Sequence, residues 1–165
     1  MRSTSSLLIA LTFLIITTSA YTKALDQKDV IHIMADSWNY NRKTGISIFL
    51  GPVKIDQGST HITAAKVITK QTDDKHMEEM TAFGDNKTQA HYWDTKTINE
   101  SALHAYAGTI HYLPTKSLIT LKENAHIQQG KNHFKGNLIY YNMNDQTIMA
   151  PKTPNSRTTI IYQPS

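Results

Sequence analysis

Hydrophobic and polar residues alternate in short segments along most of this chain, and this pattern predicts β-strands. In the segment 31–35, Ile31 and Ile33 fall on one side of a strand, whereas His32 and Met34 fall on the other. Similar segments rich in Ile, Val, Thr, Tyr and Phe follow at residues 46–50, 53–56, 62–69, 77–83, 88–93, 102–112, 118–121, 125–129, 134–142 and 158–162. Turn residues separate them, and no helical period is sustained after residue 20. The sequence therefore predicts an all-β sandwich, roll or open barrel.

One of these segments changes its apolar side partway along. Ile62 and Ala64 share one parity, and Ala65 and Val67 share the other. Because side chains alternate strictly along a regular strand, such a change indicates a strong twist or a bulge at a corner. We therefore expect a strand that buries opposite faces in its two halves.

The chain contains a weak internal repeat with an offset of 72 residues. Residues 46–69 align without a gap on residues 118–141, and the alignment extends back to residue 31, with seven identities in 39 pairs. The turn glycines Gly58 and Gly130 coincide, as do His61 and His133. The sequence thus predicts a domain of two similar β units, an architecture that suggests a surface or channel and carries no reaction centre.

The first twenty residues have the features of a secretory signal peptide. Arg2 precedes an apolar run of ten residues at 7–16, which is too short to span a bilayer, and small residues surround Ala20. We expect cleavage after Ala20, with Ala24 as the alternative, and one folded domain over residues 25–165. The chain has no cysteine and a formal charge of +4 without a basic cluster. These features fit an exported, periplasmic protein without disulfides and do not indicate nucleic-acid binding.

Candidate chemistry is sparse. The eight histidines include no H-x-H or H-E-x-x-H spacing, no thiolate is available, and His32 lies opposite Ile31 and Ile33 in parity, so outward polar positions are expected rather than a metal site. Asp36, Asp56, Asp85 and Asp94 are isolated and flank turns, as capping residues do. We expect no enzyme activity, no metal and no cofactor.

Apolar interior candidates fit either a filled core or an open groove. They include Phe49, Phe83, Leu121, Ile127, Phe134 and Ile139. Periodicity does not distinguish the two arrangements, and both alternatives stay open at this point. In the first the protein is a static adaptor, and in the second it holds an apolar ligand. A third interpretation is a polysaccharide-binding domain that stacks sugars on Trp38, Tyr92 and Trp93.

Several motifs together resemble the OstA-like domain family. They are residues 31–36, Tyr40, 51–58, 62–67, 104–107, 111–112, 124–130 and 135–137. The chain departs from the family pattern at Gly51-Pro52-Val53 and Glu123-Asn124-Ala125, where the family usually has Gly-Asn-Val, and at Ala64-Ala65-Lys66-Val67, which lacks the family's acidic residue. These departures concern turns and register rather than apolar positions.

This resemblance implies a twisted β-jelly roll shaped like an open V, in which lipopolysaccharide acyl chains slide through an apolar groove between the two membranes. It also implies head-to-tail stacking of copies, an inner-membrane-anchored LptC-like homologue at one end, and an outer-membrane LptD-like barrel assembly at the other. The lipid-binding positions that it implies, together with the apolar candidates above, are Ile31, Ile33, Phe49, Phe83, Ala90, Tyr112, Pro114 and Phe134.

Overall fold

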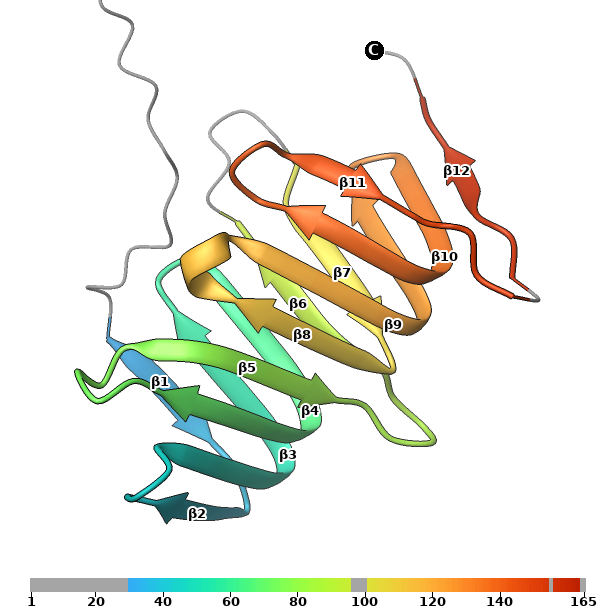
Figure 1. Cartoon of the computed structure of the whole chain (residues 1–165). Coiled ribbons are helices and arrows are strands. Elements are labelled where there is room, and N and C mark those ends of the chain that lie inside the picture. Colours follow the sequence, from blue (N-terminus) through green and yellow to red (C-terminus); the bar gives the residue numbers. More distant parts are fainter. Residues whose placement is uncertain (1–29, 96–100, 155, 164–165) are drawn as a thin grey trace, which may run out of the picture.

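The computed structural model describes residues 30–95, 101–154 and 156–163, which contain twelve β-strands and one short 3-10 helix (Figure 1). The predicted signal peptide and both cleavage positions lie outside these residues. The first unit comprises β1 (Ile31–Met34), β2 (Ser37–Asn41), β3 (Ile46–Gln57), β4 (Thr60–Gln71), β5 (Met77–Phe83) and β6 (Ala90–Asp94). The second comprises β7 (Leu103–Ala107), β8 (Thr109–Leu113), the 3-10 helix η1 (Pro114–Lys116), β9 (Leu118–Gln129), β10 (Asn132–Asn142), β11 (Thr147–Met149) and β12 (Thr159–Ile161).

Four long strands, β3, β4, β9 and β10, bend and continue from one layer of the molecule into the other. Each pairs with two short strands, one for each half. On β3, Ile55 faces Ile33 of β1, and Phe49 faces Trp38 of β2. In the same way, β6 and β5 pair with the two halves of β4, β7 and β8 with those of β9, and β12 and β11 with those of β10. All pairs are antiparallel, so the predicted all-β, jelly-roll-like architecture is confirmed.

A bulge sets the bend in each unit. The β3–β4 register shifts between Leu50 and Val53, and Gly51 has a φ of +91°. A Cβ atom on Gly51 would come within 2.3 Å of the Asp36 carboxylate, so only glycine fits this close approach. The predicted change of buried side is also confirmed, because both Ile62 and Val67 of β4 are buried. In the second unit the extra residue lies at Glu123-Asn124, both at positive φ.

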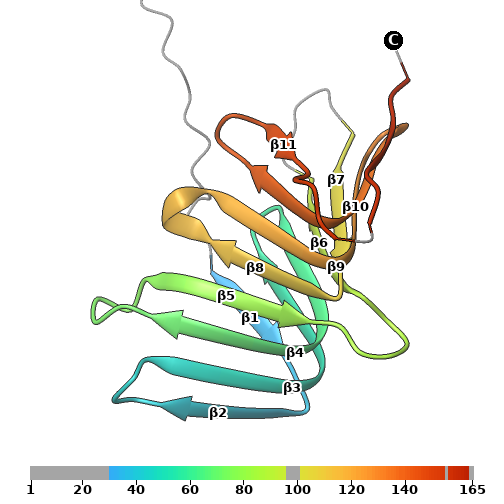
Figure 2. The ribbon, with the colours of Figure 1, turned by 45° about the vertical axis from the view of Figure 1, so that its right-hand side comes forward.

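The 72-residue repeat is a repeat of structure. Ile31 faces Gln57 just as Leu103 faces Gln129, and the bulges occupy equivalent positions. Strands β5 and β6 of the first unit pair with β8 and β7 of the second, which joins the units into one continuous arrangement (Figure 2). Within the described residues, the outermost strands are unpaired on one side: β1 and β2 at one end, and β11 and β12 at the other.

Strand boundaries differ from the predicted ones in instructive places. The predicted strand 102–112 is two strands, because Gly108 turns between layers and its N–H donates to the Glu123 carbonyl oxygen at 2.8 Å. Conversely, residues 46–50 and 53–56 form one bulged strand, as do 118–121 and 125–129. Strands β2 and β11 were not predicted, because β2 is mostly polar and β11 has only three residues.

The core fills the space between the two layers. Nineteen buried hydrophobic residues from both layers form one cluster, including the predicted Leu121, Ile127 and Ile139. Burying this apolar area is the main stabilising contribution in a chain without disulfides. No helix in the described part of the chain is long and apolar enough to cross a membrane.

Candidate functional site: an apolar interior with two open edges

The apolar interior extends from one open edge of the molecule to the other. Between the edges it is the buried cluster of both layers. At the edges, large hydrophobic side chains are exposed. At the first edge these are Val30, Ile31, Ile33, Met34, Trp38 and Tyr40, and at the second they are Met149, Ile160, Ile161 and Tyr162. Exposed apolar residues gathered on unpaired strands are typical of surfaces that bind another chain or ligand.

The first strand directs both of its isoleucines to one face, as its parity predicts, and this face is the interior one. Ile33 faces the buried Ile55 across the β1–β3 pair, and Ile31 faces Gln57. The exposed fractions of Ile33 and Ile31 are 37% and 39%, because no strand in the described part of the chain covers this edge. His32 lies on the opposite face, across from Asp56.

Three predicted site residues meet around a small cavity of about 80 Å³ between the layers. Ile31, Tyr112 and Pro114 line it together with Gln57 and Met77. They come from β1, the end of β8 and the start of η1, so strands distant in sequence build this cavity. The Tyr112 hydroxyl is buried without a hydrogen-bond partner among the described residues, and burial raises the pKa of its phenol. It is therefore a protonated donor available to a polar atom of a ligand.

The other predicted positions divide between the interior and the outer face. Phe49 and Ala90 are buried in the core, and Phe134 is half-buried against it. Phe83 differs from the expectation of an interior position. It alternates with the buried Met80 and Ala82, so its side chain lies on the outer face, where the Lys66 ammonium sits 5.7 Å from its ring centroid. Phe83 is the last residue of β5, so no further apolar residue follows it in the strand to indicate which face is buried.

Two interior features were not predicted from the sequence. Trp38 stacks on Tyr40 and on Phe49, with ring centroids 6.1 and 6.4 Å apart, and so extends the aromatic interior onto the first edge. Met143 accepts a hydrogen bond from the Tyr92 hydroxyl at 3.5 Å and thereby links β6 to the end of β10. Tyr92 is therefore buried and not a sugar platform. Cross-strand register would have revealed both features, and a single sequence does not supply it.

The outer face of the layer formed by β6, β7 and the adjoining halves of β4, β9 and β10 has a row of stacked rings, which we call the ring row. In order across these strands its members are His61, Trp93, His91, Tyr106, His126 and His133. Two pairs of imidazole nitrogens, His91–His104 and His126–His133, lie 3.1 Å apart. Among the described residues no three histidine or acidic side chains could hold a metal ion.

Burial lowers the pKa of His91 to about 4, helped by neighbouring His104, so His91 is neutral at physiological pH. An unfolded histidine titrates near 6.5. Below that pH the unfolded chain therefore binds a proton that the folded protein rejects, and the free energy of unfolding falls as the pH drops from about 6.5 to 4. We expect His91→Gln to remove on the order of 1 kcal/mol of this loss, allowing for the ring's partial exposure.

Urea unfolding at pH 7 and pH 4.5 measures this effect. The matched control is His76→Gln, because His76 lies in the exposed turn before β5. Equal pH dependence in the His91 variant and the wild type would contradict the assignment.

Comparison with known proteins agrees with this architecture. A family model described as "LptA/(LptD N-terminal domain) LPS transport protein" matches residues 32–147. The lipopolysaccharide export system protein LptH of Pseudomonas aeruginosa is 29% identical over 157 residues, covering 95% of this chain and 88% of that protein. LptA of Escherichia coli K12 is 27% identical over 161 residues, covering 97% and 85%.

The fold is similar as well. The crystal structure of LptH, described as the LptA-homologous periplasmic component of the lipopolysaccharide transport device of Pseudomonas aeruginosa, superposes with a TM-score of 0.76 at 30% identity. The match covers 85% of this chain and 99% of that one. The family match spans well over half of the chain and includes both repeat units, so this chain belongs to the LptA/LptD N-terminal domain family of lipopolysaccharide transport proteins.

Proposed function

We propose that this protein carries lipopolysaccharide across the periplasm, holding the acyl chains against its apolar interior while the sugars stay outside. The observation that carries the proposal is the apolar interior itself, which runs between two open edges and meets a cavity lined by Ile31, Tyr112 and Pro114. Relatives named as lipopolysaccharide export proteins support it. Shielding acyl chains is physically necessary, since each buried methylene contributes about 0.8 kcal/mol.

The acyl chains would enter along the side where the cavity opens. The interior is packed in its middle, so a lipid must displace side chains rather than fill an existing channel. Met77 lines the cavity, and Met143 lies where Tyr92 reaches across the layers. Because methionine is flexible and adapts to irregular apolar shapes, these residues could move aside at small energetic cost.

Transport by such a protein needs no catalysis of its own. The named relatives are transport proteins, and we assign this chain the same non-enzymatic role. Energy would then come from a partner. We further propose that a signal peptide ending at Ala20 or Ala24 directs residues 25–165 to the periplasm.

The open edges would join this protein to its partners by strand addition. We propose head-to-tail contacts between copies, an inner-membrane-anchored LptC-like homologue at one end of the assembly and an outer-membrane LptD-like barrel assembly at the other. Unpaired backbone groups and exposed apolar side chains occur together on β1, β2, β11 and β12, which supports this arrangement. The joint between the two repeat units provides a pattern for it, because β5 and β6 already pair with β8 and β7.

Photo-crosslinking in cells tests the lipid-binding proposal. A photo-reactive amino acid at Ile33 or Tyr112 should capture lipopolysaccharide, because both side chains face the interior. The matched control is His32, one residue away on the same strand but on the outer face. Equal capture at Ile33 and His32, or no capture at either interior position, would favour a static adaptor with a packed core.

A further inference from the structure

Two hydroxyl groups inside the apolar interior have no hydrogen-bond partner among the described residues. They belong to Thr60, the first residue of β4, and to Tyr112 of β8, whose exposed fractions are 5% and 4%. A buried hydroxyl without a partner destabilises the folded protein, because it has lost its hydrogen bonds to water and gained none in return. Native proteins contain few such groups, so each of them suggests a role beyond packing.

These hydroxyls belong to one polar cluster between the two layers. The Tyr92 phenol lies close to both of them, since Thr60 and Tyr112 both influence its pKa. Thr60 and Tyr92 are not aligned for a hydrogen bond with each other, and the Tyr92 hydroxyl donates to the Met143 sulfur instead. Burial raises the pKa of Tyr92 and of Tyr112, so both phenols stay protonated at physiological pH. Tyr112 therefore keeps a hydrogen that it can donate.

Of the two unpartnered hydroxyls, only that of Tyr112 belongs to a residue that lines the cavity of about 80 Å³. The lining of this cavity changes from the exposed Lys75 and His76 to the apolar Ile31 and Met77. An amphiphile bound here would keep its headgroup near the exposed side chains and its chain among the apolar ones. The first carbons of the chain would then pass Tyr112, once the flexible Met77 side chain has moved aside.

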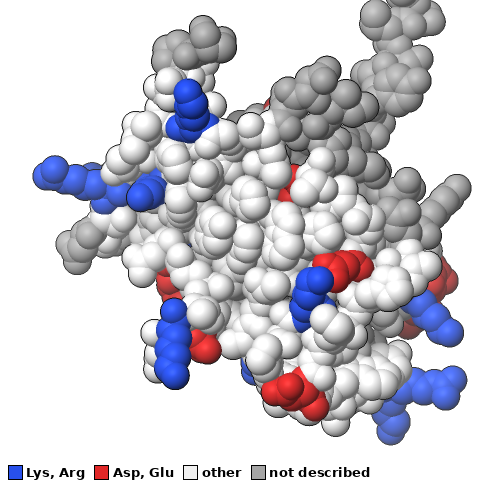
Figure 3. Space-filling view, turned by 180° about the vertical axis from the view of Figure 1, so that it is seen from behind, with Lys and Arg blue, Asp and Glu red and all other residues white. Residues whose placement is uncertain are grey.

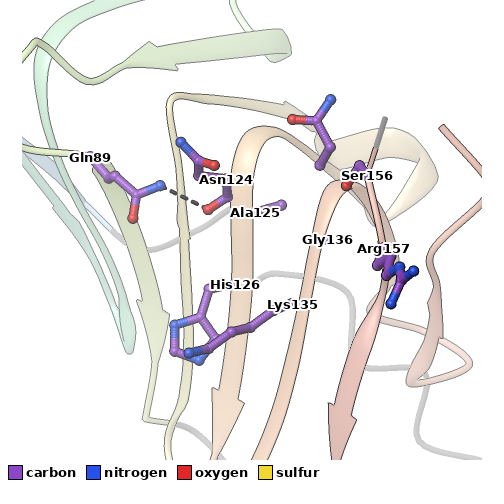
Figure 4. A pocket seen from close by; sticks show the side chains of 9 residues that line it. Gln89, Asn124, Ala125, His126, Lys135, Gly136, Ser156 and Arg157 are labelled. Carbon is purple, nitrogen blue, oxygen red and sulfur yellow. Dashed lines mark hydrogen bonds between the residues drawn. The ribbon is translucent and has the colours of Figure 1, made fainter. Parts of the chain in front are cut away.

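Polar groups on the outer face differ from Tyr112, because they are hydrated. Seen from behind Figure 1, charged side chains are sparse across the middle of the molecule (Figure 3). Elsewhere, a pocket of about 360 Å³ has Arg157 on one side and Gln89 and Asn124 on the other (Figure 4). Its Lys135 and Arg157 are exposed, so a ligand would have to replace the water around them. The Tyr112 hydroxyl is shielded from solvent, so a ligand oxygen that reaches it gains a hydrogen bond without this cost.

We propose that Tyr112 selects acyl chains that carry an oxygen atom close to the headgroup, by donating a hydrogen bond from its hydroxyl to that oxygen. The acceptor is the carbonyl oxygen of the acyl linkage or a hydroxyl group on the chain, since both offer a lone pair to a phenol. The inference rests on the proposed function in taking an acyl chain as the ligand. It goes further in assigning a polar contact inside the apolar interior, which distinguishes chains of equal length.

Three lipids that share a glycerol headgroup and a chain of equal length test the proposal. Tetradecyl glycerol ether has no carbonyl, tetradecanoyl glycerol adds one, and beta-hydroxytetradecanoyl glycerol adds a chain hydroxyl as well. In calorimetric titrations we expect the wild type to bind the last lipid about tenfold more tightly than the ether, because the buried donor gains a partner. The lipid at which the affinity rises identifies the acceptor oxygen. Tyr112→Phe should bind all three lipids with equal affinity.

The same variant should be more stable than the wild type. Tyr112→Phe keeps the ring and removes a buried hydroxyl that has no partner, so it should unfold at a higher urea concentration. A gain in stability together with a loss of selectivity separates a role in ligand binding from a role in packing. Tyr106→Phe is the matched control, because it loses a phenol hydroxyl from the ring row on the outer face and should keep the wild-type preference.

Three results would each overturn the inference. They are equal affinity of the wild type for the three lipids, a preference that survives in Tyr112→Phe, and a Tyr112→Phe protein less stable than the wild type. Photo-capture at Ile33 tests lipid binding without involving this hydroxyl. Lipopolysaccharide captured at Ile33 together with equal affinities would reject this inference alone, whereas no capture and no binding of any of the three lipids would reject the proposed function with it.

Discussion

Replacing Met77 with aspartate should block lipopolysaccharide transport while leaving the protein folded. Met77 lines the cavity beside Ile31, Tyr112 and Pro114 and is only partly buried at the start of β5. In the free protein, water can reach the carboxylate of the introduced aspartate, so the free energy of unfolding should change little. Lys75 and His76 also line the cavity, but both are exposed and can stay in water. An acyl chain at this position would therefore desolvate the carboxylate, which costs several kcal/mol and corresponds to a loss of affinity of at least about a hundredfold.

The measurements are the amount of lipopolysaccharide that co-purifies with the variant and the growth of cells that depend on it. Thr81→Asp is the matched control, because Thr81 lies on the same strand but on the outer face, between the buried Met80 and Ala82. Met77 lies on β5, inside the strand order, but it shares the cavity with Ile31 of the edge strand β1. The cysteine cross-linking described below is therefore repeated in the Met77→Asp protein, to separate loss of lipid binding from failed assembly. Normal transport by a folded Met77→Asp protein would place the lipid elsewhere.

The sequence was sufficient to predict the architecture because the repeat and the alternation are both local signals. Residues 72 positions apart in the sequence form equivalent strand pairs and equivalent bulges in the structure. The change of parity between Ile62 and Val67 correctly predicted a bent strand. Each half of the strand buries one face, so apolar residues occupy alternate positions in each half. Strand β2 lacks a pattern that predicts a strand, because its interior face consists of Trp38 and Tyr40 among polar neighbours at an exposed edge.

Candidate site residues were harder to predict, because the lining of a space depends on register between distant strands. Parity placed Ile31 and Ile33 on one face of their strand, and the family resemblance implied that this face is interior, as the structure shows. Phe83, expected in the interior, lies on the outer face. The histidines show the same limit. Their outward parity was evident one strand at a time, but the ring row exists only because β4, β6, β7, β9 and β10 align them side by side. Neither tyrosine nor histidine content in a single strand indicates such stacking.

A pair of introduced cysteines should link copies of the protein into covalent chains. Within the molecule, Tyr92 of β6 faces Ala105 of β7 across the joint between repeat units. Ile33 is the repeat equivalent of Ala105, and Ile160 faces Phe134 as Tyr92 faces Ile62. If copies join as the units do, Ile160 of one copy faces Ile33 of the next. The chain has no cysteine of its own, so Ile160→Cys with Ile33→Cys gives an unambiguous readout.

Directly opposed residues on neighbouring strands have Cα atoms about 4.5–5.5 Å apart, which suits a disulfide. Mild oxidation should therefore convert most of the double variant into a ladder on a non-reducing gel, because each copy offers one cysteine to each neighbour. Either single variant should stay monomeric, since a head-to-tail contact never brings two identical positions together. Ile161→Cys with Ile33→Cys is the stricter control: a shift of one residue turns the side chain to the other face, so this pair should not link. A ladder from both pairs would show unspecific contact, and dimers from a single variant would show a symmetric interface in place of a head-to-tail one.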